Sequence, residues 1–206
     1  TLLQSIAGVV PVPRGQVTIA GTDIARTDLR TLSRRIGFVF QDPGTSLNPL
    51  LTLERQITES LDTHRDLTRR AATARAVELL AAVGLPDPEM RLHAYPHQLS
   101  GGQRQRVMIA IALACDPELL IADEPTTALD VTTQARILDL MAGLVRDQGM
   151  GLLLITHDLA VVQGLAQDIA VLERGQLVET APAADFFAGP RQRYSRELLA
   201  AAAHQP

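Results

Sequence analysis

Leu119-Leu120-Ile121-Ala122-Asp123-Glu124 combines four apolar residues with two carboxylates that follow them directly. A short apolar run of this kind is typical of a strand that is buried on both faces in a parallel sheet. In open α/β sheets, ligands bind beyond the carboxyl ends of the strands, where these two acidic residues would lie. Asp123 suits Mg²⁺, which takes hard oxygen ligands, and Glu124 suits a group that orients or deprotonates an attacking water. A solvated acidic turn before Pro125 is the alternative interpretation.

Segments on both sides of this strand continue the pattern. Apolar runs over residues 36–40 and 151–156 predict two more buried strands, and residues 15–20 predict an earlier one. Helical periodicity lies between and around them, over residues 1–7, 28–35, 100–115 and 131–148. This alternation predicts an α/β fold in which a parallel sheet is covered on both faces.

The stretch from residue 42 to 107 interrupts the alternation of strands and helices. It opens with a loop rich in Pro, Gly and Ser over residues 41–49, continues as helices over 52–61 and 68–83, and is irregular over 86–98. We therefore expect an α-helical subdomain inserted into the α/β core. The predicted parts are residues 1–41 and 108–180 for the two halves of the core, 42–107 for the helical subdomain, and 181–206 for a C-terminal helical extension.

The C-terminal part of the chain contains one hairpin and two helices by the same criteria. Residues 169–172 and 176–178 flank Glu173-Arg174-Gly175 and predict two antiparallel strands joined by a turn. Short helices are expected near residues 183–188 and 194–203.

Composition limits the class of protein. The chain has 206 residues and 46% hydrophobic residues, which is enough to bury a core and excludes wholesale disorder. With 19 Lys and Arg against 23 Asp and Glu, the net charge is −4, which argues against a dedicated nucleic-acid-binding protein. One cysteine, Cys115, excludes a disulfide framework and favours a reducing compartment. No apolar run reaches the roughly 18 residues of a membrane span.

A glycine pair begins the helix that precedes the acidic strand. In Leu99-Ser100-Gly101-Gly102-Gln103, Ser100 is a good N-terminal cap, and the two glycines leave backbone N–H groups open to an anion. The helix dipole adds partial positive charge at the same point. Phosphate binding and an ordinary capped Gly-rich turn both remain open for this segment taken alone.

Five segments together, in order, resemble the nucleotide-binding subunit of ATP-binding cassette (ABC) transporters. They are Phe40-Gln41 (Q-loop), Leu99-Ser100-Gly101-Gly102-Gln103 (signature sequence), Leu119 to Glu124 (Walker B), Thr127-Ala128-Leu129-Asp130 (D-loop) and Ile155-Thr156-His157-Asp158 (switch histidine). The resemblance covers nearly the whole chain. It implies a P-loop NTPase (RecA-like) core with an inserted helical subdomain, and it implies ATP and Mg²⁺ as nucleotide and cofactor.

The resemblance also implies a role for each matching residue near the γ-phosphate. Asp123 would hold Mg²⁺, and Glu124 would be the general base or water-polarising group. His157 would contact the γ-phosphate and sense its loss. Gln41 would contact Mg²⁺ and the attacking water, and would link the site to the membrane partner. We therefore expect Glu124, His157 and Gln41 to be the catalytic residues.

ABC ATPases work as head-to-tail pairs, so the resemblance implies a second ATPase subunit, identical or not. In such a pair, Ser100, Gly101, Gly102 and Gln103 would bind the γ-phosphate of ATP held by the partner. Asp130 would help to couple the two sites.

Three further stretches resemble importers of the oligopeptide, dipeptide and nickel group. They are Gln41-Asp42-Pro43-Gly44-Thr45-Ser46-Leu47-Asn48-Pro49, Tyr95-Pro96-His97-Gln98, and the ending from Gly189-Pro190 through Tyr194-Ser195-Arg196 to Leu198-Leu199. This resemblance implies peptide-like cargo or nickel. It also implies permease partners that contact residues 42–51, an indirect substrate-binding protein, a location at the cytoplasmic face of the cell membrane, and no nucleic-acid partner.

The start of the sequence resembles the helix that follows the family's phosphate-binding loop. Thr1-Leu2-Leu3-Gln4-Ser5-Ile6-Ala7-Gly8 has no Met and no cap before it. We therefore expect these 206 residues to begin just after the Lys and Ser of that Walker A loop, with Thr1 beside the nucleotide. On that expectation, the 206 residues alone would lack ATPase activity while still completing a partner's site.

Two alternatives from other classes remain. The first is a soluble ABC ATPase acting in DNA repair or translation, although the 58 residues between Gln41 and Ser100 are too few for the long coiled coil of such proteins. The second is a catalytically inactive half-site with a regulatory or structural role, and for the complete protein the presence of Glu124 and His157 argues against it.

Overall fold

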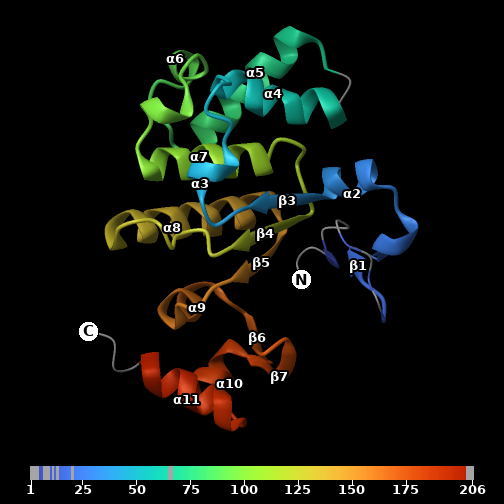
Figure 1. The fold of residues 1–206 in the computed structure, drawn as a ribbon, viewed down its shortest axis with the longest axis vertical. Coiled ribbons are helices and arrows are strands. Elements are labelled where there is room, and N and C mark those ends of the chain that lie inside the picture. Colours follow the sequence, from blue (N-terminus) through green and yellow to red (C-terminus); the bar gives the residue numbers. More distant parts are fainter. Residues whose placement is uncertain are drawn as a thin grey trace. The chain divides into compact units, whose positions relative to one another are not determined.

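A computed structural model describes residues 5–6, 10, 12, 14–19, 21–64 and 67–202. The chain divides into two compact units, Thr1–Ile155 and Thr156–Pro206, and each is described by itself. The first unit contains a three-stranded parallel sheet with helices and a small antiparallel pair of strands around it (Figure 1).

The parallel sheet contains β3 (Ile36–Val39), β4 (Leu119–Asp123) and β5 (Gly151–Ile155), in the spatial order β3-β4-β5. Hydrogen bonds and one ion pair also link the amino ends of these three strands. The Glu118 N–H donates to the Arg35 carbonyl at 2.9 Å, the Gly151 N–H donates to the Glu118 carbonyl at 2.9 Å, and the two side chains of Arg35 and Glu118 form an ion pair. Because β4 is central, its carboxyl end lies between those of the other two strands. The predicted parallel sheet is confirmed.

Both faces of the sheet are covered, and β4 shows why. Leu120 and Ala122 pack in one core cluster together with Ile137 and Met141 of α8 (Val131–Gln148). Leu119 and Ile121 point to the opposite face, because side chains alternate along a strand. There they join a cluster formed by the N-terminal part of the chain, whose buried members are Ile19, Ile24, Leu32, Ile36 and Ile121.

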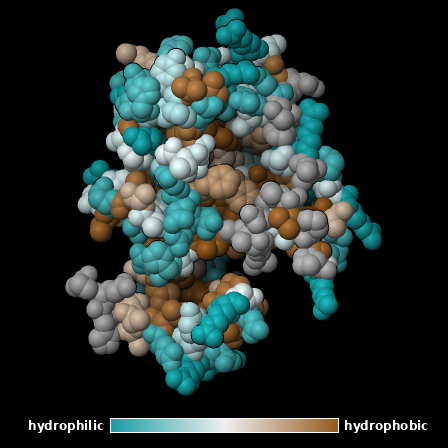
Figure 2. Space-filling model, in the orientation of Figure 1, coloured by the Kyte–Doolittle hydropathy of each residue, from teal (hydrophilic) through white to brown (hydrophobic). Residues whose placement is uncertain are grey.

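The helical part of the first unit packs around α7 (Gly101–Ala112). α4 (Leu53–His64) places Leu53, Ile57 and Leu61, four residues apart, on one fully buried face. α5 (Arg69–Ala82) lies next to both α4 and α7. Figure 1 shows these helices grouped at one side of the sheet, and Figure 2 shows mostly hydrophilic residues over the outer surface of α4, α5 and the neighbouring helix α6 (Pro88–Arg91). The predicted domain boundaries at residues 42, 108 and 181 stay predictions.

Two segments expected to be irregular contain short helices. In the segment 41–49, the Asp42 carboxylate accepts the Gly44 N–H at 2.7 Å and caps α3 (Pro43–Ser46). Proline suits the first turn of a helix, since the N–H that it lacks has no intrahelical partner there. The same reason accounts for α6 (Pro88–Arg91) and the 3₁₀ turn η2 (Pro96–Gln98) within residues 86–98.

The N-terminal part is less regular than predicted. The expected strand over 15–20 is reduced to β1 (Thr18–Ile19), which pairs antiparallel with β2 (Thr22–Asp23). The 3₁₀ turn η1 (Ile24–Arg26) and helix α2 (Leu29–Arg35) follow. Of the helix expected over residues 1–7, Ser5 and Ile6 are helical, and the remaining residues lie outside those that the structure describes.

Gly37 in β3 allows α7 to approach the sheet closely. A Cβ atom at this position would meet the Ala112 carbonyl group at the end of α7 and Cδ1 of Leu120. The close approach brings the carboxyl end of α7 against β3, so only glycine fits here.

The second unit contains α9 (Leu159–Leu165), the hairpin β6 (Asp168–Glu173) and β7 (Gln176–Pro182), and the helices α10 (Ala183–Ala188) and α11 (Arg193–Ala202). The hairpin is confirmed and is longer than predicted. In β7 the buried carboxylate of Glu179 accepts the N–H groups of Arg191 (2.7 Å) and Gln192 (3.1 Å). These bonds tie the segment before α11 to the hairpin. No helix among the described residues is long and apolar enough to cross a membrane.

Candidate active site

The two acidic residues lie where the sequence places them. Asp123 is the last residue of β4, in register with Ile155 of β5. Glu124 follows, and its N–H donates to the Ile155 carbonyl at 2.9 Å. Its φ of 45° is in the left-handed region, which a non-glycine residue rarely adopts. The bond to β5 holds this strained turn, and strain of this kind is often found at functional sites.

Gln41 reaches Glu124 from the neighbouring strand. It follows β3, and its Nε2 donates to Oε2 of Glu124 at 2.9 Å across a sequence separation of 83 residues. The contact forms because β3 and β4 are adjacent and parallel, so that their carboxyl ends meet at one edge. The structure therefore brings together two of the three predicted catalytic residues.

Thr127 is a third member of this group that sequence reasoning did not select for the site. Its hydroxyl donates to the same Glu124 Oε2 at 3.1 Å, and its N–H donates to the Glu124 carbonyl at 3.3 Å. Both a backbone bond and a side-chain bond therefore close the turn from Glu124 to Thr127. A Ser or Thr three residues after an acidic residue at a strand end is the sequence signal that indicates such a turn.

Asp123 is half-buried beside a second negative charge. Burial raises its pKa above the ordinary value, and the charge of Glu124 raises it further. A cation would relieve this penalty, so the pair of carboxylates fits a divalent ion. No cluster of three or more acidic, His or Cys side chains suited to a metal occurs among the described residues. Mg²⁺ fits such a sparse site, since it is commonly held by one or two carboxylates together with waters and substrate phosphates.

The signature residues form a helix start with a capping box. Ser100 Oγ accepts the Gln103 N–H at 3.3 Å, while Gln103 Oε1 accepts the Ser100 N–H at 3.0 Å. This reciprocal arrangement is a capping box. The side chain of Gln103 is therefore engaged in the cap, and the N–H groups of Gly101 and Gly102 are the remaining donors at this helix end.

Gly102 also has a packing role that the glycine pattern did not predict. A Cβ on Gly102 would lie 2.6 Å from Cγ2 of Thr133 in α8, and one on Gly101 would lie 3.5 Å from Leu129. Asp130 caps α8 by accepting the Thr133 N–H at 3.0 Å. The hydrogen bonds from Thr133 lower the pKa of Asp130 and favour its charged form. The beginnings of α7 and α8 are thus in contact.

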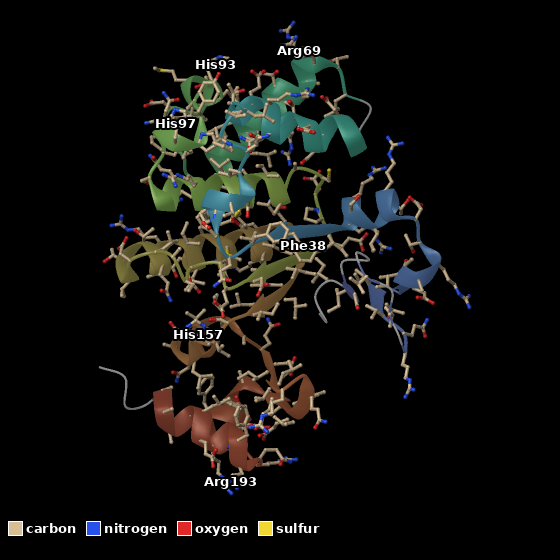
Figure 3. All side chains as sticks on the ribbon, viewed as in Figure 1. Phe38, Arg69, His93, His97, His157 and Arg193 are labelled. Carbon is tan, nitrogen blue, oxygen red and sulfur yellow. The ribbon has the colours of Figure 1, made fainter. Side chains whose placement is uncertain are left out.

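His157 lies in the turn after β5 and is exposed. The next residue, Asp158, caps α9 by accepting the Ala160 N–H at 2.9 Å. Figure 3 labels His157 beside α9, within the second unit. The expected contact of His157 with a γ-phosphate stays a prediction. Thr1 lies outside the residues that the structure describes.

Comparison with known proteins gives matches over most of the chain. The family model described as ABC transporter matches residues 1–127. A peptidoglycan transport ATP-binding protein of Agrobacterium fabrum is 51% identical over 193 residues, which are 92% of this chain and 35% of that protein. A dipeptide transport ATP-binding protein of Haemophilus influenzae is 49% identical over 204 residues, which are 95% of this chain and 62% of that protein.

The solved structures agree with the fold described above. A dimeric ATP-binding cassette in a post-hydrolysis state, bound to ADP and phosphate, has a TM-score of 0.74 and 31% identity. The match covers 88% of this chain and 79% of that chain. The chain spans between about a third and two thirds of the length of the two curated relatives.

Proposed function

The chain belongs to the ABC transporter family, whose model matches residues 1–127, and we propose that it is the ATP-hydrolysing subunit of an importer for peptide-like solutes. The observation that carries the proposal is the hydrogen bond between Gln41 and Glu124, next to Asp123. The bond places the amide of Gln41 beside two adjacent carboxylates, those of Asp123 and Glu124, at the carboxyl end of the central strand. The dipeptide and peptidoglycan transport relatives support peptide-like cargo over nickel.

Each residue of this group has a distinct part in the proposed hydrolysis. Glu124 orients the attacking water and accepts its proton at a carboxylate oxygen. Asp123 would hold Mg²⁺, directly or through water, and the ion would supply positive charge beside the phosphates. Gln41, which is bonded to Glu124 in the nucleotide-free protein, would instead contact the ion and the water through its amide when nucleotide is bound. Phosphoryl transfer of this kind depends mainly on positioning and charge stabilisation.

The start of α7 is proposed to bind the γ-phosphate of the nucleotide held by a partner subunit. Its N–H groups at Gly101 and Gly102 and its helix dipole form an anion site of the usual kind. The dimeric cassette with ADP and phosphate supports a paired arrangement. In that pair, His157 would contact the γ-phosphate of the ATP held by its own subunit. Asp130 would link the two nucleotide-binding sites.

The subunit is proposed to act at the cytoplasmic face of the membrane, bound to permease subunits. Residues 42–51 supply the contact surface, where Leu50 is 82% exposed. A substrate-binding protein delivers cargo to the permease on the other side.

The test is reconstitution of the subunit with its transporter partners. The subunit would be expressed with its permease genes, purified as a complex and placed in liposomes with the matching binding protein. We expect Mg²⁺-dependent ATP hydrolysis and ATP-dependent uptake of a radiolabelled dipeptide, and loss of both in a Glu124→Gln complex. Hydrolysis without permease association, or copurification with nucleic acid or ribosomes instead, would contradict the proposal.

A further inference from the structure

Thr127 makes two bonds to a single residue, Glu124. The hydroxyl donates to carboxylate Oε2 at 3.1 Å, and the backbone N–H donates to the Glu124 carbonyl at 3.3 Å. The second bond closes a turn over residues 124–127. The backbone of this turn therefore keeps the Thr127 hydroxyl within hydrogen-bond distance of the Glu124 carboxylate. The side chain of Thr127 is exposed, and it has no role in the hydrophobic core.

The same carboxylate oxygen also accepts the amide of Gln41 at 2.9 Å. The two donors lie on different segments of the chain. Gln41 lies on a separate segment, 83 residues away in sequence, whereas Thr127 belongs to the same turn as Glu124. A change in the segment after β3 can therefore remove the Gln41 bond without disturbing the Thr127 bond.

The backbone of Glu124 is also held in place by neighbouring residues. With its φ of 45°, Glu124 is in a conformation that few side chains adopt. Its N–H is tied to Ile155, and its carbonyl is tied to Thr127. These two bonds fix the backbone, and the Thr127 hydroxyl extends the restraint to the carboxylate.

We propose that Thr127 is the positioning residue for Glu124, and that it keeps the carboxylate oriented when Gln41 leaves it. The inference rests on the proposed ATPase function for its kinetic consequence, but the hydrogen bond itself belongs to the nucleotide-free protein. Thr127 touches neither water nor phosphate in this scheme, so its effect passes entirely through Glu124.

The kinetic test uses Thr127→Val, which keeps the shape of the side chain and removes the hydroxyl, in the complete transporter. We expect kcat for ATP hydrolysis to fall about tenfold, as for the loss of one hydrogen bond to a charged group, with KM for ATP nearly unchanged. Thr127→Ser should restore kcat. The matched control is Thr132→Val, which makes the same change at an exposed threonine on the first turn of α8 and should leave kcat as it is.

A second test needs no nucleotide and separates this inference from the proposed function. Tm is measured for Thr127→Val, Glu124→Ala and the double variant. We expect Thr127→Val to lower Tm in the presence of Glu124 and to have no effect once Glu124 is alanine.

The outcomes distinguish two failures. An unmodified transporter that does not hydrolyse ATP would overturn the proposed function, while the coupling in Tm would still test the hydrogen bond. Additive Tm effects would overturn the inference, as would unchanged kcat in Thr127→Val or an equal loss in Thr127→Ser.

Discussion

Gln41 and Glu124, 83 residues apart in the sequence, are joined by a hydrogen bond of 2.9 Å from Nε2 to Oε2. The bond exists because β3 and β4 are adjacent parallel strands whose carboxyl ends meet. It places the amide expected to contact Mg²⁺ and water on the residue expected to accept the proton. We therefore expect nucleotide binding to compete with this bond for Gln41.

Replacing Glu124 with Gln should abolish turnover and retain nucleotide binding. The neutral amide keeps the size of the side chain and can still accept a bond from Gln41 or Thr127, but it cannot take a proton from water. General-base catalysis is worth about 10²–10⁴-fold, so we expect kcat to fall by at least about 10²-fold. ATP affinity, measured by fluorescence titration, should stay close to the unmodified value. A Glu124→Gln transporter that hydrolyses ATP at the normal rate would refute the role of Glu124.

Replacing Asp123 with Asn should raise Tm at neutral pH in the absence of nucleotide and Mg²⁺. Burial, followed by the charge of Glu124, raises the pKa of Asp123 in the folded state. The folded protein therefore binds the proton more tightly than the unfolded chain, and it loses stability as pH rises through the raised pKa. Asparagine removes that loss.

The pH dependence of Tm provides the control for this prediction. Well below the ordinary Asp pKa of 3.8, Asp123 is protonated in both states, so the Tm difference between the two proteins should reach its lowest value and stop changing with pH. The difference should then grow with pH across the range between the ordinary and the raised pKa. A Tm difference that is constant from pH 3 to pH 8 would contradict it.

Replacing Gly102 with Ala should destabilise the protein as well as impair its function. The new Cβ would lie 2.6 Å from Cγ2 of Thr133. Overpacking of this kind costs about 1–3 kcal/mol, measurable by urea denaturation. Adding Thr133→Ser removes Cγ2 while keeping the backbone N–H that Asp130 caps, so the double variant should recover most of the lost stability.

ATPase activity of the double variant then separates the two reasons for a glycine at this position. If Gly102 also approaches the phosphate of a partner's nucleotide, activity should remain low after stability has recovered. Full recovery of activity would show that Gly102 is required only to fit against α8.

Replacing Gln105 with Met should stabilise the protein. Gln105 is 0% exposed, and its side-chain amide has no hydrogen-bond partner within the part of the chain that the structure describes. Burying an unpaired amide is unfavourable, and methionine fills a similar volume without that penalty. We expect the free energy of unfolding to rise by about 1 kcal/mol.

Gln103→Met is the matched comparison, because it makes the same substitution two residues earlier in the same helix. The Gln103 amide accepts the Ser100 N–H in the capping box, so its loss should lower stability. Equal effects of the two substitutions would contradict the assignment of Gln105 as an unpaired buried amide.

Several elements follow from local sequence. Residues 131–148 are predicted as a helix and form α8 with the same bounds, since Asp130 caps one end and Gly149, with φ of 64°, ends the other. Helix α10 likewise coincides with the predicted residues 183–188. The short helix α3 is missing from the prediction, because Pro43 and Gly44 favour a loop unless the cap by Asp42 is taken into account.

The sequence by itself determined the α/β class, the strand that ends at Asp123, the capped start of α7 and the order of the family's motifs. These features depend on residues close together in the chain, where periodicity and capping act. Only the tertiary structure decided that Gln41 reaches Oε2 of Glu124, that the left-handed backbone of Glu124 is tied to Ile155 of β5, and that Gly102 packs on Thr133. Those relationships depend on the order and register of β3, β4 and β5 and on helix packing, which arise from contacts between residues distant in sequence.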